Sequence, residues 1–128
     1  MTIRIPGDTA YGNTYTINGG LLDIANNARS LPGSVITVDG GALQVGGTLE
    51  VGGEMTVADG TVSAGNAVRV ESTGELNLFD GAEVNSTFDL VNEGVFNKAA
   101  ESDVELNADM QNLGLVTIGR GQIGRAHV

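Results

Sequence analysis

Residues 119–124 place glycines at positions 119, 121 and 124 and therefore match the G-x-G-x-x-G string of dinucleotide-binding loops. Such a loop lies between a strand and a helix, because the helix N-terminus binds the pyrophosphate. Four residues follow Gly124, which is too few for that helix. We therefore predict that this segment binds no nucleotide, and no other motif in the chain predicts a cofactor.

Two pairs of carboxylates stand twenty residues apart and could repel one another across neighbouring turns of a repeat. They are Asp89 with Asp109 and Glu83 with Asp103, and Arg69 is expected beside Asp89. A hard cation such as Ca²⁺ would relieve the repulsion, whereas unpaired side chains would relieve it by turning into water. The glycine-rich nonapeptide repeat of calcium-binding solenoids is absent from the sequence. We expect the side chains to turn into water and predict no metal site.

No combination of nucleophile and base is recognisable in the sequence. His127 is the only histidine, and the chain has no cysteine. Hydrolysis of polysaccharides needs a close pair of acids, but the acids here are spread along the chain. The triplet Asn85-Ser86-Thr87 is a formal glycosylation sequon, which we interpret as a turn. We therefore predict that the protein is not an enzyme.

Three glycines recur at a spacing of twenty, and each opens a short strand-like run. They are Gly74, Gly94 and Gly114, and Asn92 and Asn112 precede two of them by two residues. A fixed period of this length is typical of repeat architectures. We expect these glycines and asparagines to form structural turns, since Asn side chains bond to nearby backbone. The stacked Asn92 and Asn112 could also bond to each other.

Other side chains recur with the same period. The predicted apolar columns are Val70, Leu90 and Met110; Leu76, Phe96 and Val116; and Ala64, Val84 and Val104. Between apolar columns lies the polar column Asn77, Asn97 and Thr117, as expected for the outward face of strands. Lys98 interrupts an apolar column. Either the strand bends outward before Lys98, or the lysine stem packs while its ammonium reaches water.

Short alternating runs separated by Gly-Gly, Asp-Gly or Gly-Asn pairs indicate brief strands with sharp corners. The runs include residues 42–45, 48–51, 55–57 and 67–70. A helical solenoid is excluded by the 20 glycines, because each costs about 1 kcal/mol in a helix interior. An antiparallel sandwich is the main alternative, since Asp-Gly pairs also mark hairpins. The recurring columns favour an all-β, single-domain parallel β-helix, or β-solenoid, of about six coils of ~20 residues.

We divide the chain into three parts. Residues 1–36 form an N-terminal strand and capping segment, residues 37–118 form the β-solenoid coils, and residues 119–128 form a C-terminal tail. Residues 21–32 lack a two-residue alternation, so that a short helix or an irregular loop ending at Pro32 is expected there. A solenoid exposes apolar side chains and strand edges at its ends, and we expect the N-terminal part to cover one of them.

Charge is distributed unevenly along the chain. It carries 16 acids and six Lys or Arg residues, for a net charge of −10. Most of the acids lie in residues 37–118, which would repel phosphate, and we predict no nucleic-acid partner. Basic residues near the two chain ends are predicted to dock on a protein partner: Arg4, Arg120, Arg125 and His127. The chain starts without the apolar stretch of a signal peptide, and no apolar run is long enough to predict a membrane span.

Several segments resemble the passenger repeats of bacterial autotransporter adhesins. They are residues 15–24 and 33–49, and residues 91–97 and 111–118 are similar to rungs of the same broad class. The resemblance implies a right-handed parallel β-helix. It implies no single function, because similar rungs are found in adhesins, phage tailspikes and virion decoration proteins. The chain also resembles the bactofilin polymers in length and coil number.

This resemblance, together with the chain's length and charge, leads us to expect a non-enzymatic structural protein of a tailed-phage particle. We expect a decoration or cement protein on the capsid surface of the virion, with the major capsid protein as its partner. A homotrimer is expected by analogy with decoration proteins at three-fold positions. The alternatives are an extracellular adhesin or receptor-binding fragment, a bactofilin-like polymer and a polysaccharide-degrading enzyme.

Overall fold

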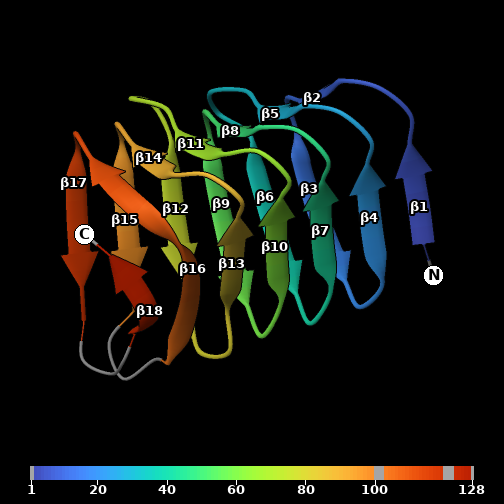
Figure 1. Cartoon of the computed structure of the whole chain (residues 1–128). Coiled ribbons are helices and arrows are strands. Elements are labelled where there is room, and N and C mark those ends of the chain that lie inside the picture. The colour runs from blue at the N-terminus through green and yellow to red at the C-terminus, as the bar shows by residue number, and fades with distance from the viewer. Residues whose placement is uncertain (1, 100–102, 120–122, 128) are drawn as a thin grey trace.

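The protein is a β-solenoid of about six coils, in which the chain winds along three faces and each coil lies against the previous one (Figure 1). The computed structural model describes residues 2–99, 103–119 and 123–127. Every ladder between the named strands is parallel, from β1 (Thr2–Ile5) with β4 (Leu21–Ile24) to β15 (Val95–Lys98) with β17 (Leu115–Ile118). The predicted fold class is confirmed, and the antiparallel sandwich is excluded.

Each coil contributes one strand to each of three faces, which we name sheets A, B and C. Sheet A contains β1, β4, β7 (Ala42–Val45), β10 (Thr61–Ala64), β13 (Glu83–Ser86), the first part of β16 (Val104–Asn112) and β18 (Ile123–His127). Sheet B contains β2 (Thr9–Tyr11), β5 (Ala28–Ser30), β8 (Leu49–Val51), β11 (Val68–Val70), β14 (Leu90–Asn92) and the last part of β16. Sheet C contains β3 (Thr14–Asn18), β6 (Val35–Asp39), β9 (Glu54–Ala58), β12 (Glu75–Leu78), β15 and β17.

The core is a stack of inward-facing side chains, because alternate residues of each strand point to opposite faces. On sheet C one inner column is formed by Tyr15, Ile36, Met55, Leu76, Phe96 and Val116. Its middle members are fully buried, as Met55 and Phe96 illustrate. The column of Leu76, Phe96 and Val116 and the polar column of Asn77, Asn97 and Thr117 are both as predicted.

The predicted columns of sheets A and B are shifted by two residues, at one member in sheet B and at two members in sheet A. Val68, and not Val70, lies beside Leu90, and Val62, and not Ala64, lies beside Val84. The next residue in that column is Leu106 instead of Val104. The cause is the variable length of the coils, since partners are 19 residues apart at Thr2 and Leu21 but 22 apart at Thr61 and Glu83. The corners absorb the extra residues while the strands keep their stacking.

The helix or irregular loop expected at residues 21–32 is not formed. The segment contains β4 and β5, which pair with β7 and β8 as ordinary rungs of the second coil. Strand pairing thus begins at β1, ahead of residue 37. At the other end β18 pairs with β16, so that this part of segment 119–128 lies along the solenoid. In the described part of the chain, no helix is long and apolar enough to cross a membrane.

The recurring glycines occupy the corner between sheets B and C for a steric reason. A Cβ atom at Gly94 would overlap the backbone carbonyl oxygens of Glu71 and Gly74 in the coil beside it, and Gly74 and Gly114 meet similar backbone contacts. None of the three has a positive φ; that conformation occurs at other glycines, for example at Gly33 in an earlier coil and at Gly40 between sheets C and A. Close stacking of successive coils therefore requires glycine here.

Candidate functional site

The basic residues predicted to dock on a partner do not form one cluster. Arg4 lies on β1, at the N-terminal end of the solenoid, and its Nε donates to Asp23 Oδ2 at 3.2 Å. Arg125 and His127 belong to β18, at the opposite end (Figure 1). Arg120 lies outside the described residues. Any contact that uses these residues must therefore be made separately at each end.

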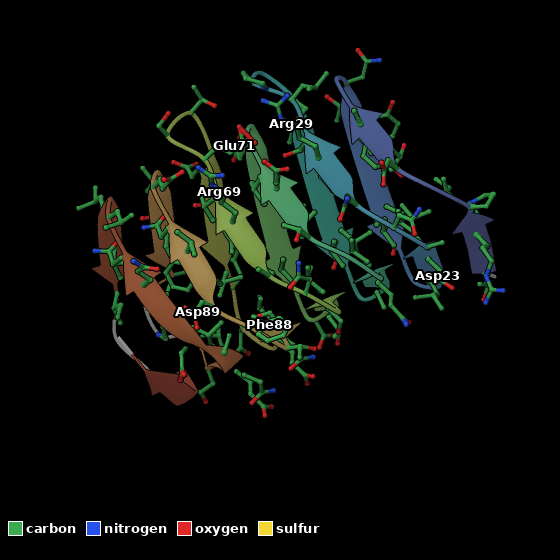
Figure 2. The ribbon with its side chains drawn as sticks, turned by 45° about the horizontal axis from the view of Figure 1, so that its top comes forward. Asp23, Arg29, Arg69, Glu71, Phe88 and Asp89 are labelled. Carbon is green, nitrogen blue, oxygen red and sulfur yellow. The ribbon has the colours of Figure 1, made fainter. Side chains whose placement is uncertain are left out.

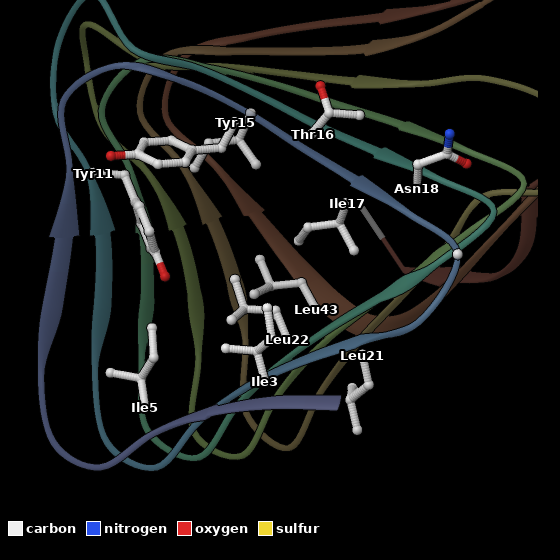
Figure 3. Close-up of a pocket in the computed structure, with 12 residues that line it drawn as sticks. Ile3, Ile5, Tyr11, Tyr15, Thr16, Ile17, Asn18, Leu21, Leu22 and Leu43 are labelled. Atoms are coloured by element: carbon white, nitrogen blue, oxygen red, sulfur yellow. The ribbon is translucent and has the colours of Figure 1, made fainter. Parts of the chain in front are cut away.

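The N-terminal end of the solenoid holds an open apolar cavity. Inward-facing side chains of the first described coil line this cavity, as Figure 3 shows for Ile3, Ile5 and Ile17. The cavity has a volume of about 450 Å³ and is also lined by Leu22 and Leu43 from later coils. We expected the N-terminal part of the chain, within residues 1–36, to help cover one end. In the structure the first coil instead forms the wall of an uncovered end.

Two tyrosines form the aromatic part of this end. The rings of Tyr11 and Tyr15 lie edge to face, with centroids 4.8 Å apart and planes inclined by 71°, which is a favourable arrangement of aromatic quadrupoles. Burial raises the pKa of Tyr11, whose hydroxyl oxygen is buried without a hydrogen-bond partner among the described residues. Tyr15 is 39% exposed although its column partner Ile36 is buried. The end therefore presents an apolar surface that water contacts directly.

Strand edges surround the cavity. The joined ladder of sheets A and B terminates in β1 and β2, and sheet C terminates in β3. Each of these strands is hydrogen-bonded on one side only, so that backbone N–H and C=O groups are left on the other side. Such edges pair readily with another chain. The N-terminal end thus combines apolar side chains with available backbone donors and acceptors.

Sheet B carries a row of alternating charges on its outer surface. In register along the row lie Arg29, Glu50 and Arg69. The guanidinium of Arg29 binds Glu71 through two hydrogen bonds of 3.0 and 3.1 Å, and the Nη2 of Arg69 lies 2.7 Å from Glu93 Oε1. These ion pairs link different coils, and Figure 2 shows Arg29, Arg69 and Glu71 on the same face.

The ion pairs shift the pKa of their members in the expected directions. Hydrogen bonding to Arg29 lowers the pKa of Glu71, even though burial of the carboxylate opposes the shift. The hydrogen bonds that Arg29 donates to Glu71 and Arg69 donates to Glu93 raise the pKa of the two guanidinium groups. The expectation that Arg69 lies beside Asp89 was wrong: Arg69 is in register with Val91. The charges of this row thus neutralise one another and are available only in part to a partner.

The carboxylate pairs singled out in the sequence are arranged differently from one another. Glu83 lies in register with Glu105, and not with Asp103. Asp89 and Asp109 do line one shallow groove at the corner between sheets A and B, together with Phe88. Within the described residues, no group of three or more acidic or histidine side chains is placed to hold a metal ion. This groove therefore offers hydrogen-bond acceptors beside an aromatic ring.

The remaining motifs lie on sheet A or beyond it. Asn85 of the sequon is in β13, a strand and not the expected turn, where its amide donates to Glu83 and Ser63. It also accepts a hydrogen bond from Asn107 in the next coil. The G-x-G-x-x-G string runs into β18, a strand, where a dinucleotide site would need a helix. Asn85 thus belongs to a regular rung of the solenoid, and the last two residues of the string, Ile123 and Gly124, belong to a strand.

The C-terminal coils contain polar groups in their interior. Asn92 is fully buried, and its amide donates to Asn112 Oδ1 and to Leu115 O, each at 2.9 Å; the bond between the two asparagines was anticipated. Lys98 is 2% exposed, and its strand keeps its register without bending outward. The stem packs in the core, and the ammonium donates to the carbonyls of Ala99 and Gly119.

Sequence reasoning missed the most prominent of these features, the open N-terminal cavity. Its signal was present in the concentration of large apolar side chains in residues 1–17, namely Ile3, Ile5, Tyr11, Tyr15 and Ile17. Only the coil assignment reveals that these side chains face inward at a terminus.

Comparison of the chain with protein-family models, with curated proteins and with solved structures gave no match in any of the three. The assignment of the fold therefore depends on the strand pairing described above, and the function must be argued from the molecule itself.

Proposed function

We propose that this protein is a non-enzymatic structural protein, and most specifically a decoration or cement protein that docks on the major capsid protein of a phage virion. The observation that carries the proposal is the continuous parallel pairing from β1 to β17 along three sheets. Each coil is hydrogen-bonded to the next and buries its apolar column beneath it. A solenoid of this kind is suited to resisting force and heat rather than to opening and closing around a substrate.

The distribution of charge supports docking by the C-terminal segment. The body of the chain is strongly acidic, whereas residues 119–128 contain two arginines, one histidine and no acid. Strand β18 attaches part of this segment to β16. A basic segment held against an acidic rod would direct the rod end-on towards an acidic patch of a partner, because opposite potentials steer association.

The experiment is a binding assay with capsids that lack the protein, together with a copy count on purified virions. We expect tens to hundreds of copies in each virion. The double variant Arg120→Glu, Arg125→Glu should bind more weakly, with a loss that is largest at low salt. Deletion of residues 119–128 should weaken binding further. Arg69→Glu, a charge reversal on the outer face of sheet B and outside the predicted docking residues, is the control and should bind like wild type. Undiminished binding by the deletion variant would contradict the proposal.

A second function, carbohydrate or receptor binding by an adhesin fragment, is favoured by the groove at the corner of sheets A and B. Phe88 is 62% exposed there, next to Thr87, Asp89 and Asn107. An aromatic ring beside hydrogen-bonding side chains fits a sugar ring, which has an apolar face and a polar edge. A glycan array probed with wild type and with Phe88→Ala tests this function. Binding that Phe88→Ala abolishes would support it, and an array without signal would remove it.

A further inference from the structure

We propose that the open N-terminal end is a self-association surface, which binds the same end of a second copy of this chain in a two-fold, head-to-head dimer. The proposed capsid docking uses the opposite end of the solenoid, so the two contacts are independent. Three observations lead to the proposal: uncovered apolar side chains, unpaired strand edges and local charge balance.

The first observation is the contrast between the first coil and the coils behind it. Ile3 is 52% exposed and Tyr15 is 39% exposed, whereas Leu43 and Ile36 in the same columns are 3% and 4% exposed. Solenoids normally need terminal units with a polar outer side to remain soluble. This first coil has apolar inward side chains and an open cavity instead. Covering it removes apolar surface from water, at about 25 cal/mol per Å².

The second observation is the set of free edges on β1, β2 and β3. A two-fold axis across the end brings edge strands of one copy close to edge strands of the partner that run in the opposite direction. Antiparallel pairing then satisfies backbone groups that are otherwise left to water. The contact is isologous, because both copies contribute the same patch. An isologous contact closes on itself and gives a dimer of defined size.

The third observation is the local charge. Two copies of a chain with net charge −10 repel each other over most of their surfaces. Residues 1–36 differ from the acidic body, since they contain two acids, Asp8 and Asp23, and two bases, Arg4 and Arg29. Arg4 and Asp23 already neutralise each other on sheet A. Two N-terminal ends can therefore approach each other with little net repulsion.

The interior of the C-terminal end favours this arrangement over head-to-tail stacking. The last members of its inner columns include Asn112, and the coil before it contains the buried Lys98. An apolar partner placed on Asn112 would deprive that side chain of water without supplying a hydrogen bond. Sheet A also ends differently there, since β18 adds one further strand beyond β16. Strand β17 also exposes Leu115 and Ile118 at this end, so the C-terminal surface is mixed, whereas the side chains that line the N-terminal cavity are mostly apolar.

The mass of the free protein over a range of concentrations tests the dimer. Sedimentation and light scattering should give twice the 13.1 kDa chain mass for wild type, and Tm should rise with concentration, because association stabilises the folded state. Ile3→Asp on β1 and Tyr15→Asp on β3 should each weaken dimerisation by at least about tenfold, since both place a charge in the buried centre of the contact. Phe88→Asp, an equally drastic change away from both ends, is the control and should remain dimeric. Far-UV circular dichroism verifies that each variant is folded.

The orientation of the two copies is tested by a single spin label. The chain contains no cysteine, so Gln111→Cys on the exposed C-terminal part of β16 provides one labelling site. Two solenoids of six coils joined head to head place these labels about 50 Å apart, at ~4.8 Å for each coil. Side-by-side or head-to-tail copies place them about half as far apart.

Each alternative result overturns the proposal. A wild-type protein that is monomeric at high concentration, a species of three chains, or open filaments seen by electron microscopy would each exclude the closed two-fold contact. A label distance of about 25 Å in a dimer would exclude the head-to-head orientation. No capsid is present in these measurements, so their outcome does not depend on whether the protein docks on a capsid.

Discussion

The two ends of the solenoid are built from the same kind of coil but differ in their interiors. At the N-terminal end the inner columns begin with Ile3 and Tyr15, which are large, apolar and partly exposed. In the last coils the same interior contains the Asn92–Asn112 hydrogen bond and the buried Lys98. The N-terminal end leaves inward-facing apolar side chains uncovered. The C-terminal coils combine the exposed Leu115 and Ile118 with buried polar groups, of which Asn92 Oδ1 has no hydrogen-bond partner among the described residues.

This difference shows what a stacked repeat leaves undetermined. Stacking fully buries an inward-facing residue only when another coil lies on each side. In the middle of the solenoid this burial therefore requires no contact with another molecule. A terminal coil is covered on one side, and its properties depend on which side chains it contains. The predictions that follow compare equivalent positions near the two ends.

The largest effect is expected in the inner column of sheet C. Phe96→Ala removes a fully buried ring and should lower the free energy of unfolding by about 3–5 kcal/mol. Tyr15→Ala, in the same column at the N-terminal end, should cost about 1 kcal/mol in the monomer because the ring is 39% exposed there. Chemical denaturation at low protein concentration measures both values. Equal losses would mean that the N-terminal end is covered as completely as the middle.

A comparable contrast is expected at the corner between sheets B and C. In Gly94→Ala the new methyl group would collide with the backbone of the neighbouring coil, at Glu71 O and Gly74 O, and should cost about 3 kcal/mol or more. Gly12→Ala, at the same corner of the first coil, is the matched control. Its Cβ would meet Leu31 Cδ1 at 3.5 Å, an ordinary contact, and Tm should hardly change. If both variants melt alike, the steric account of the repeated glycines is incorrect.

An intermediate effect is expected from the polar interior of the C-terminal coils. Asn92→Ala removes two hydrogen bonds from a buried position and should destabilise the protein by about 1–3 kcal/mol. Asn97→Ala is the control, since its amide donates to Asn77 on the outward face, where water can replace the bond. Thermal unfolding of both variants tests the difference. A larger loss for Asn97→Ala would show that the buried asparagines do not stabilise the C-terminal end.

The smallest effect is expected from the ion pairs that link the coils between the two ends. The pKa of Glu71 is lowered in the folded protein, so its contribution to stability is fully present above the ordinary carboxylate pKa. The contribution disappears as the pH falls through the lowered value. Glu71→Gln should lower Tm by a degree or two at neutral pH and low salt, as is usual for exposed pairs. The difference from wild type should vanish in acid; a difference that persists there would assign the effect to packing.

The sequence predicted the fold class and part of the stacking correctly. The coils through Gly74, Gly94 and Gly114 have a nearly constant length, and there the columns of sheet C were confirmed. Columns that crossed the longer corners failed, as with Val70 and Leu90. A period predicts register only while every corner has the same number of residues, and a corner can gain residues without disturbing the strands that it connects.

The N-terminal third shows the same limit more strongly. Residues 21–32 have no visible alternation, and a helix or loop was expected in place of β4 and β5. Strands of three or four residues are too short for a two-residue pattern to be recognised, particularly where Leu21 and Leu22 are adjacent. Pairing with coils on either side stabilises these strands, and that pairing is not a local property.

By itself, the sequence determined that the chain winds as an all-β repeat, that its surface is acidic and that glycine recurs where coils must approach closely. These features are encoded locally, in composition and spacing. Only the tertiary structure decided which coil lies at each end, that Arg29 reaches Glu71 across 42 positions, and that Ile3 and Tyr15 frame an open cavity. These properties depend on which residues become neighbours in the folded chain. The number of residues in every corner sets the register between coils and therefore decides which residues become neighbours.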